Sequence, residues 1–166
     1  MLDKMEKLFL KVSSVIPSFA LLLMMFMVVV EVISREIFGY SFQVVHELTG
    51  YLLVGIVFVG VTYSFENGSF VKIDMLYSRF SPKWKKSMDK LFIILLIIYT
   101  SILTYYIIIL NLNSFYLKSS STSILRTPLY LPQFLMSFGM IVFILYLLIV
   151  LLKLFATSEK NALGGE

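Results

Sequence analysis

The chain has 166 residues, of which 59% are hydrophobic and 14% charged, and its mean hydropathy is +0.92. Soluble domains contain only about 45–50% apolar residues, so this composition excludes an ordinary soluble protein and indicates an all-α integral membrane protein. The net charge of +4 does not indicate nucleic-acid binding, because the basic residues lie in short segments between apolar runs. With no cysteine and one histidine, disulfides, thiolate metal sites and a two-histidine haem axis are excluded, so we expect no cofactor.

The first predicted span covers about residues 12–34, after a short polar segment with three lysines. Its uncharged run is close to the ~20 residues that a membrane-spanning helix needs. A cleaved signal peptide is the alternative interpretation. The run is longer than the usual ~7–15 residues of such a segment, and no small-residue cleavage site follows it. We therefore expect the helix to be retained.

Several charged or titratable residues lie around the link to the second span. Glu31 and Arg35 are four positions apart, in the acid-before-base order that favours an ion pair along one helix. His46 and Glu47 open the second span. Charges this close to hydrocarbon are costly unless they are paired, hydrated or covered by protein. These residues are therefore candidates for contact with a partner, or they mark the helix ends where water begins.

The second predicted span covers about residues 44–65 and contains three glycines, Gly50, Gly55 and Gly60. Their five-residue spacing differs from the four-residue GxxxG spacing, so they do not share one helix face. We expect a close approach of a neighbouring helix at one or two of them. A turn signal, Glu66 to Ser69, follows.

Residues 70–80 are too short and too charged to span a membrane. Apolar residues recur at positions i, i+3, i+4 and i+7 from Ile73, which predicts a short amphipathic helix lying flat at the membrane interface. A loop with some strand character is the alternative.

The third predicted span, about residues 82–111, begins with Ser81 as N-cap and Pro82 at the first helical position. Thirty residues extend ~45 Å as a helix, so its ends should reach the headgroups unless it is strongly tilted. Thr100 and Thr104 lie one turn apart, and they bond either their own i−4 carbonyls or a neighbouring helix.

A polar link, residues 111–128, separates this span from the fourth, at about residues 129–152. The link is either a flexible loop or a re-entrant turn held by a partner. Residues 156–166 form a polar tail that we expect to be cytoplasmic and disordered.

The basic residues predict the orientation. Eleven of the 14 lysines and arginines lie in the N-terminal segment, in residues 66–90 and in the tail, against three in the two other links. By the positive-inside rule, both termini face the cytoplasm and the links near Arg35 and Arg126 face outward.

Motifs for catalysis are missing from the sequence: there is no HExxH, no nucleophile elbow, no glycine-rich phosphate loop and no convincing carboxylate pair. We therefore expect no enzyme activity. The spans also lack the matching helix breaks that build a transporter's midplane site.

Three short motifs in this order resemble the small membrane subunit of TRAP transporters, the DctQ-like family. They are an Arg-x-x-Phe at Arg35, an acid that opens the second span at Glu47, and a Val-Lys-Ile-Asp that ends at Asp74. Arg35 matches the family's arginine after the first span, and Glu47 matches the second acid of its Trp-x-Glu-Glu. Asp74 matches the aspartate after a His-Val or His-Ile pair.

The sequence departs from these patterns at three positions. Val44 replaces the tryptophan, His46 replaces the first acid and Phe70 replaces the histidine.

The resemblance implies a bacterial inner-membrane protein that works with two partners. A soluble periplasmic binding protein captures an organic anion, such as a carboxylate or an acidic sugar like sialic acid. A large DctM-like membrane subunit then carries the anion inward with sodium by an elevator movement. The small subunit would widen the fixed scaffold in the bilayer and offer a docking surface. The residues that we expect to contact partners are Glu31, Arg35, His46, Glu47, Asp74 and Arg126.

Two other functions remain open from the residues alone. A small four-span proton-coupled exporter would use Glu31 as its proton carrier, although Arg35 lies one turn away. The chain could also be an accessory subunit of an unrelated membrane complex.

Overall fold

The computed structural model describes residues 2–68, 82–123 and 125–163. It contains four long helices, α1 (Leu2–Phe38), α2 (Gln43–Glu66), α4 (Pro82–Tyr116) and α5 (Tyr130–Leu163). Each carries a stretch long and apolar enough to cross a membrane. The prediction of an all-α protein with four membrane-spanning helices is therefore confirmed. The predicted interfacial helix at residues 70–80 lies outside the described residues.

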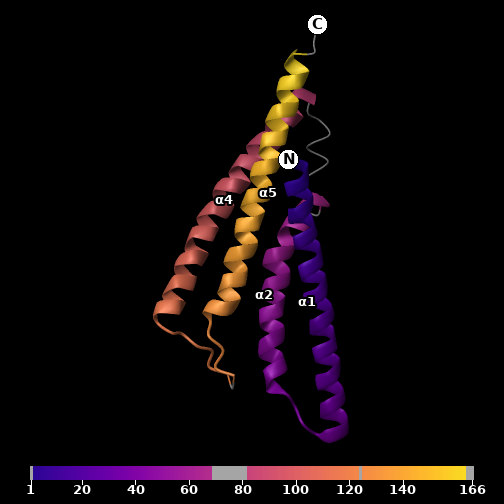
Figure 1. Ribbon diagram of the computed structural model, residues 1–166, viewed down its shortest axis with the longest axis vertical. Coiled ribbons are helices and arrows are strands. Elements are labelled where there is room, and N and C mark those ends of the chain that lie inside the picture. The colour runs from indigo at the N-terminus through magenta and orange to yellow at the C-terminus, as the bar shows by residue number, and fades with distance from the viewer. Residues whose placement is uncertain (1, 69–81, 124, 164–166) are drawn as a thin grey trace.

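The helices form a row in the order α4, α5, α2, α1, with α2 and α5 at the centre (Figure 1). Because consecutive helices run in opposite directions, residues 39–42 and 117–129 lie at one end of the row, here called the link end. The first residues of α1, the last residues of α2 and the last residues of α5 lie toward the opposite end, here called the terminal end. The outer flanks of the row are formed by α1 and α4.

The most buried side chains lie between the two central helices. Val59 and Thr62 of α2 are fully buried, and so are Tyr146 and Leu147 of α5. The ring of Phe65 meets Tyr146 edge-on, with the ring centroids 6.3 Å apart. Many large apolar side chains on the outer surfaces of the helices remain exposed, as expected where lipid or another protein covers them.

Glycine lets two pairs of helices come close together. A Cβ atom placed on Gly60 would lie 3.5 Å from Cγ of Pro17, which is ordinary contact between α2 and α1. A Cβ on Gly55 would lie 3.9 Å from Leu135 of α5, whereas Gly50 faces open space. The tightest approach is at Gly139 of α5, where a Cβ would lie 2.4 Å from the carbonyl oxygen of Phe58 in α2. The sequence pattern did not single out Gly139.

All four helices extend beyond the predicted spans. α1 begins at Leu2 and therefore includes the lysine-bearing segment, and α4 continues to Tyr116. The expectation of a disordered tail is wrong for residues 156–163, which continue α5 as far as Leu163. Once a long apolar helix has formed, each further residue adds a hydrogen bond without a new nucleation cost, and this tail contains good helix formers.

The two threonines in the middle of α4 bond to their own helix. The Thr100 hydroxyl donates to the Leu96 carbonyl, and the Thr104 hydroxyl donates to the Thr100 carbonyl, each at 2.7 Å. Of the two predicted alternatives, the structure has the bond to the i−4 carbonyl.

Candidate functional site at the link end

The corner between α1 and α2 brings Glu31 together with Arg35 and Ser41. α1 closes at Gly39, which has a φ of 69° and donates its N–H to the Arg35 carbonyl at 3.1 Å. Glu31 is only 4% exposed. Its Oε1 accepts a hydrogen bond from the Ser41 hydroxyl at 3.0 Å, and Arg35 Nη1 lies 3.9 Å from the same oxygen. The predicted ion pair is thus present at long range, and Ser41 is the nearer partner.

Glu47, in the first turns of α2, is the centre of a second polar group. The Tyr51 hydroxyl, one turn along the helix, donates to Glu47 Oε1 at 2.6 Å. The Ser123 hydroxyl donates to the other carboxylate oxygen, Oε2. Ser123 also receives a hydrogen bond from the Ser121 hydroxyl at 3.0 Å. We call Glu47, Tyr51, Ser121 and Ser123 the Glu47 cluster. The hydrogen bond between Ser123 and Glu47 connects the α4–α5 link to the start of α2.

The α4–α5 link, residues 117–129, closes on itself through backbone hydrogen bonds. The N–H of Ser121 donates to the Thr127 carbonyl at 2.9 Å, and the N–H of Leu129 donates to the Ser119 carbonyl at 3.0 Å. These pairs bracket an isolated bridge between Ser120 and Pro128. Its described residues, 117–123 and 125–129, therefore form a closed loop that is held by its own backbone and by Glu47.

The two basic residues of the loop have left-handed backbone conformations, with φ values of 48° at Lys118 and 46° at Arg126. Lys118 ends α4: its N–H donates to the Phe115 carbonyl at 3.3 Å, and the N–H of Ser119 donates to the Ser114 carbonyl at 3.0 Å. This is the Schellman pattern, in which glycine is the usual residue at the left-handed position. The Arg126 N–H donates to the Ser123 carbonyl at 3.1 Å. Such strained positions persist only where surrounding contacts hold them, so the loop presents two exposed cations in a defined shape.

Five of the predicted partner residues lie at the link end: Glu31, Arg35, His46, Glu47 and Arg126. His46 is exposed at the start of α2. Asp74 lies outside the described residues.

Sequence reasoning missed the hydroxyl groups of this region. Ser41, Tyr51 and Ser123 all donate to the predicted acids. Tyr51 is four residues after Glu47, and this spacing was a usable signal. Ser123 is 76 residues from Glu47, so no local pattern connects the two.

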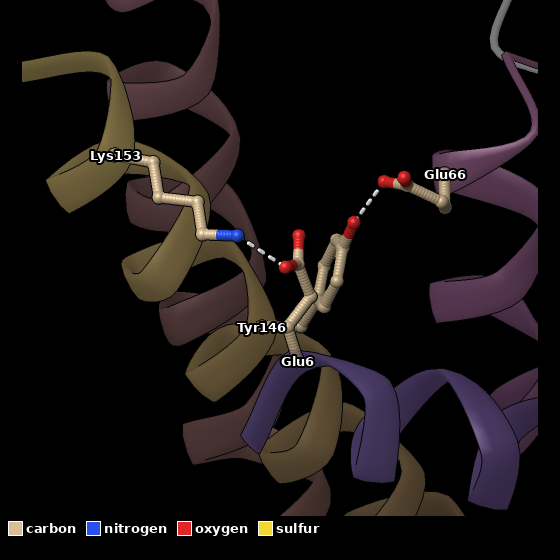
Figure 2. Close-up of polar contacts among 4 residues, drawn as sticks. All are labelled: Glu6, Glu66, Tyr146 and Lys153. Atoms are coloured by element: carbon tan, nitrogen blue, oxygen red, sulfur yellow. Dashed lines mark hydrogen bonds and ion pairs between the residues drawn. The ribbon is translucent and has the colours of Figure 1, made fainter. Parts of the chain in front are cut away.

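A separate polar group ties three helices together at the terminal end (Figure 2). Tyr146 of α5 donates its hydroxyl to the carboxylate of Glu66, the last residue of α2. Lys153, two turns further along α5, bonds to Glu6 of α1. These contacts hold the helices of this protein to one another. Among the described residues, no group of three or more histidine or acidic side chains is placed to hold a metal ion.

A profile of the tripartite ATP-independent periplasmic transporter family, DctQ component, matches residues 24–157. The chain belongs to the DctQ family. No curated protein and no solved structure matches it. The matched region includes Glu31, Arg35, the Glu47 cluster and the loop with Arg126.

Membership in this family makes the chain the small membrane component of a TRAP transporter. DctQ proteins work with a large DctM membrane subunit and a periplasmic binding protein, and the family is one of transporter components, not of enzymes. Together with four apolar helices, the match indicates a multi-pass protein of the inner membrane.

Proposed function

We propose that this DctQ subunit serves as a fixed scaffold for the large membrane subunit of a sodium-coupled importer. Its substrate is an organic anion, either a carboxylate or an acidic sugar such as sialic acid. The link end faces the periplasm and is the docking surface for the binding protein, whereas both termini face the cytoplasm.

The scaffold role is supported by hydrogen bonds that polar side chains make between helices in the described part of the chain. Glu47, Glu66 and Lys153 are each bonded to a residue of another helix or link. The α4–α5 contact, the α2–α5 contact and the α1–α2 contact join the four helices into one row. A scaffold of this kind supplies an immobile neighbour for a large subunit that moves its substrate by an elevator movement.

The docking role is supported by one observation, the shape of the loop between α4 and α5. Glu47 and the backbone hold it closed, so Lys118 and Arg126 are exposed at fixed positions. Arg35 and Glu36 are exposed in the last turn of α1, at the same end. A few charges in a defined arrangement steer an approaching soluble protein and set its register more than they add affinity.

The proposed orientation follows from charge. The link end carries three of the 14 lysines and arginines, and the other 11 lie in segments that belong to the opposite side of a four-span topology. Cytoplasmic segments carry the excess of basic residues.

Reconstitution tests the proposed function. Liposomes would receive this chain with its large subunit, and labelled acidic sugars or dicarboxylates would be added with the binding protein. We expect uptake only when all three proteins and an inward sodium gradient are present, with an equal potassium gradient as the control. Equal uptake without this chain, when the large subunit is otherwise intact, would contradict the scaffold and docking roles.

A further inference from the structure

The two flanks of the helix row differ in chemistry although both are open. The exposed face of α1 in its apolar stretch is formed by aliphatic, methionine and phenylalanine side chains, including Phe19, Leu22 and Phe26, together with Ser18. α4 instead exposes Tyr116 at its end and three tyrosines further inside its apolar stretch. Tyr99, Tyr105 and Tyr106 are 62%, 61% and 66% exposed.

These tyrosines lie near the middle of the membrane-spanning stretch. The apolar part of α4 runs over Ser87–Tyr116, so its midpoint falls between residues 101 and 102. At the helical rise of ~1.5 Å per residue, the three tyrosine Cα atoms lie within roughly 7 Å of that midpoint. The hydrocarbon core is about 30 Å thick, so all three lie well inside it.

A tyrosine hydroxyl at this depth needs a hydrogen-bond partner. Tyrosine is enriched at the membrane surface because its hydroxyl can reach water there, and a polar group left unpaired in hydrocarbon is costly. Within the part of the chain that the structure describes, Tyr51 and Tyr146 donate to carboxylates. The three α4 hydroxyls have no such partner there, and Tyr105 and Tyr106 contact each other only through their rings.

The surface around two of these tyrosines is shaped to receive a helix. A shallow groove of about 340 Å³ runs along α4, and its lining residues are Tyr99, Ile102, Leu103, Tyr106, Ile107 and Leu110. These residues recur at spacings of three and four, so they form one face of the helix. Grooves between such rows of side chains accept the ridge of a neighbouring helix.

We propose that the groove face of α4, defined by Tyr99, Ile102, Tyr106 and Leu110, is covered by a transmembrane helix of the large membrane subunit. That helix supplies acceptors for the tyrosine hydroxyls, such as backbone carbonyls beside small residues or serine and threonine oxygens. The outer face of α1 meets lipid instead. This inference rests on the proposed function, and it adds which flank of the row faces the partner.

Site-specific photocrosslinking within the assembled complex tests the assignment. A benzophenone amino acid would replace Ile102 on α4 in one variant and Leu22 on α1 in the matched control, after each tagged variant has been shown to co-purify the large subunit. We expect light to link the Ile102 variant to the large subunit and the Leu22 variant only to lipid. Crosslinks from Leu22 in place of Ile102, or from Ile102 to a second copy of this chain or to lipid alone, would overturn the assignment while leaving the subunit role standing. Failure of the unmodified chain to co-purify any large subunit would overturn both.

Removal of the hydroxyls provides a second readout that keeps the ring shapes. Hydrogen bonds between membrane helices each change association roughly threefold, so the Tyr99→Phe, Tyr106→Phe double variant should lower retention of the large subunit roughly tenfold in a detergent titration. Tyr116→Phe, at the end of α4, is the control and should leave retention unchanged. Equal retention by the double variant and the control would contradict the role of the hydroxyls.

Discussion

Gly139 of α5 lies directly against the backbone of Phe58 in α2. A Cβ atom at position 139 would lie 2.4 Å from the Phe58 carbonyl oxygen and 2.8 Å from the Val59 nitrogen. Real side chains do not tolerate such distances, so the two central helices can pack this closely only because residue 139 has no side chain. Small residues at helix crossings let the backbones of membrane helices approach closely and pack well.

Replacing Gly139 by alanine should therefore weaken the α2–α5 contact. The neighbouring atoms are backbone and cannot rotate away, so the helices must separate, at a cost of about 1–3 kcal/mol. Gly50→Ala is the matched control, since a Cβ there meets nothing within 4 Å and should leave stability equal or slightly higher. The stability of both variants is measured by unfolding in mixed micelles of increasing SDS content. If the two variants unfold at the same SDS content, the close approach at Gly139 is contradicted.

The hydroxyl of Tyr146 is expected to stabilise the terminal end of the bundle. Tyr146 is fully buried and donates to Glu66 (Figure 2). Tyr146→Phe removes the donor and leaves the carboxylate without it, so we expect a loss of about 1–2 kcal/mol in the same unfolding assay. Tyr63→Phe, on a half-exposed ring of α2, should change stability little. A loss of the same size in both variants would show that the Glu66 bond contributes nothing specific.

Glu47 should act by positioning the 117–129 loop. Glu47→Ala removes the acceptor for both Tyr51 and Ser123, so the loop loses its attachment to α2. Because the chain has no cysteine, a single Ser120→Cys substitution reports loop exposure through its rate of reaction with a thiol reagent. We expect that rate to rise several-fold in the Glu47 variant, since bonds to a charged group are among the stronger ones.

Glu36→Ala is the control for this experiment. Glu36 is an exposed acid at the same end of the bundle, so it matches Glu47 in charge, and the labelling rate at position 120 should not change. If Glu47→Ala leaves the rate as it was, the backbone bonds of the loop hold it without Glu47.

Arg126 should affect transport through docking of the binding protein. Arg126→Glu keeps a long side chain at an exposed position and reverses its charge, so uptake should fall and should recover partly when a charge on the binding protein is reversed. The fall should be smaller at high salt, because the Debye length is only ~8 Å at physiological ionic strength. Lys7→Glu, exposed near the start of α1, is the control. Unchanged uptake in the assembled Arg126 variant would leave this arginine as a headgroup anchor.

The orientation is open to a direct labelling test. Single cysteines at Tyr40 and Ser120 should react with an impermeant reagent added outside intact spheroplasts, and a cysteine at Lys85 should react only after permeabilisation. Tyr40 is preferred to Gly39, whose φ of 69° disfavours a side chain. Labelling of the Lys85 variant from outside would reverse the proposed topology.

The sequence alone determined that the fold is four membrane-spanning helices in this order. Hydrocarbon requires about 20 consecutive apolar residues and an internally bonded backbone, so long uncharged runs have only one stable structure there. The sequence also identified Glu31, Arg35 and Glu47 as candidates for contact with a partner, because a charge beside an apolar run costs free energy unless it is paired, hydrated or covered by protein. The ends of α1 and α5 were less predictable because a formed helix continues easily into polar residues.

The tertiary structure alone decided which helices are neighbours and what each polar group contacts. Hydropathy does not predict which helices pack together in a bilayer. Lipid is as apolar as a leucine side chain, so an apolar helix face is equally stable against lipid and against another helix. The central position of α2 and α5 therefore depends on a close approach at Gly139, which no sequence pattern marked. The pairing of Glu47 with Ser123 likewise depends on a loop 76 residues away being folded back onto α2. Local spacing predicts contacts along one helix, and only the packed bundle brings together residues from different ones.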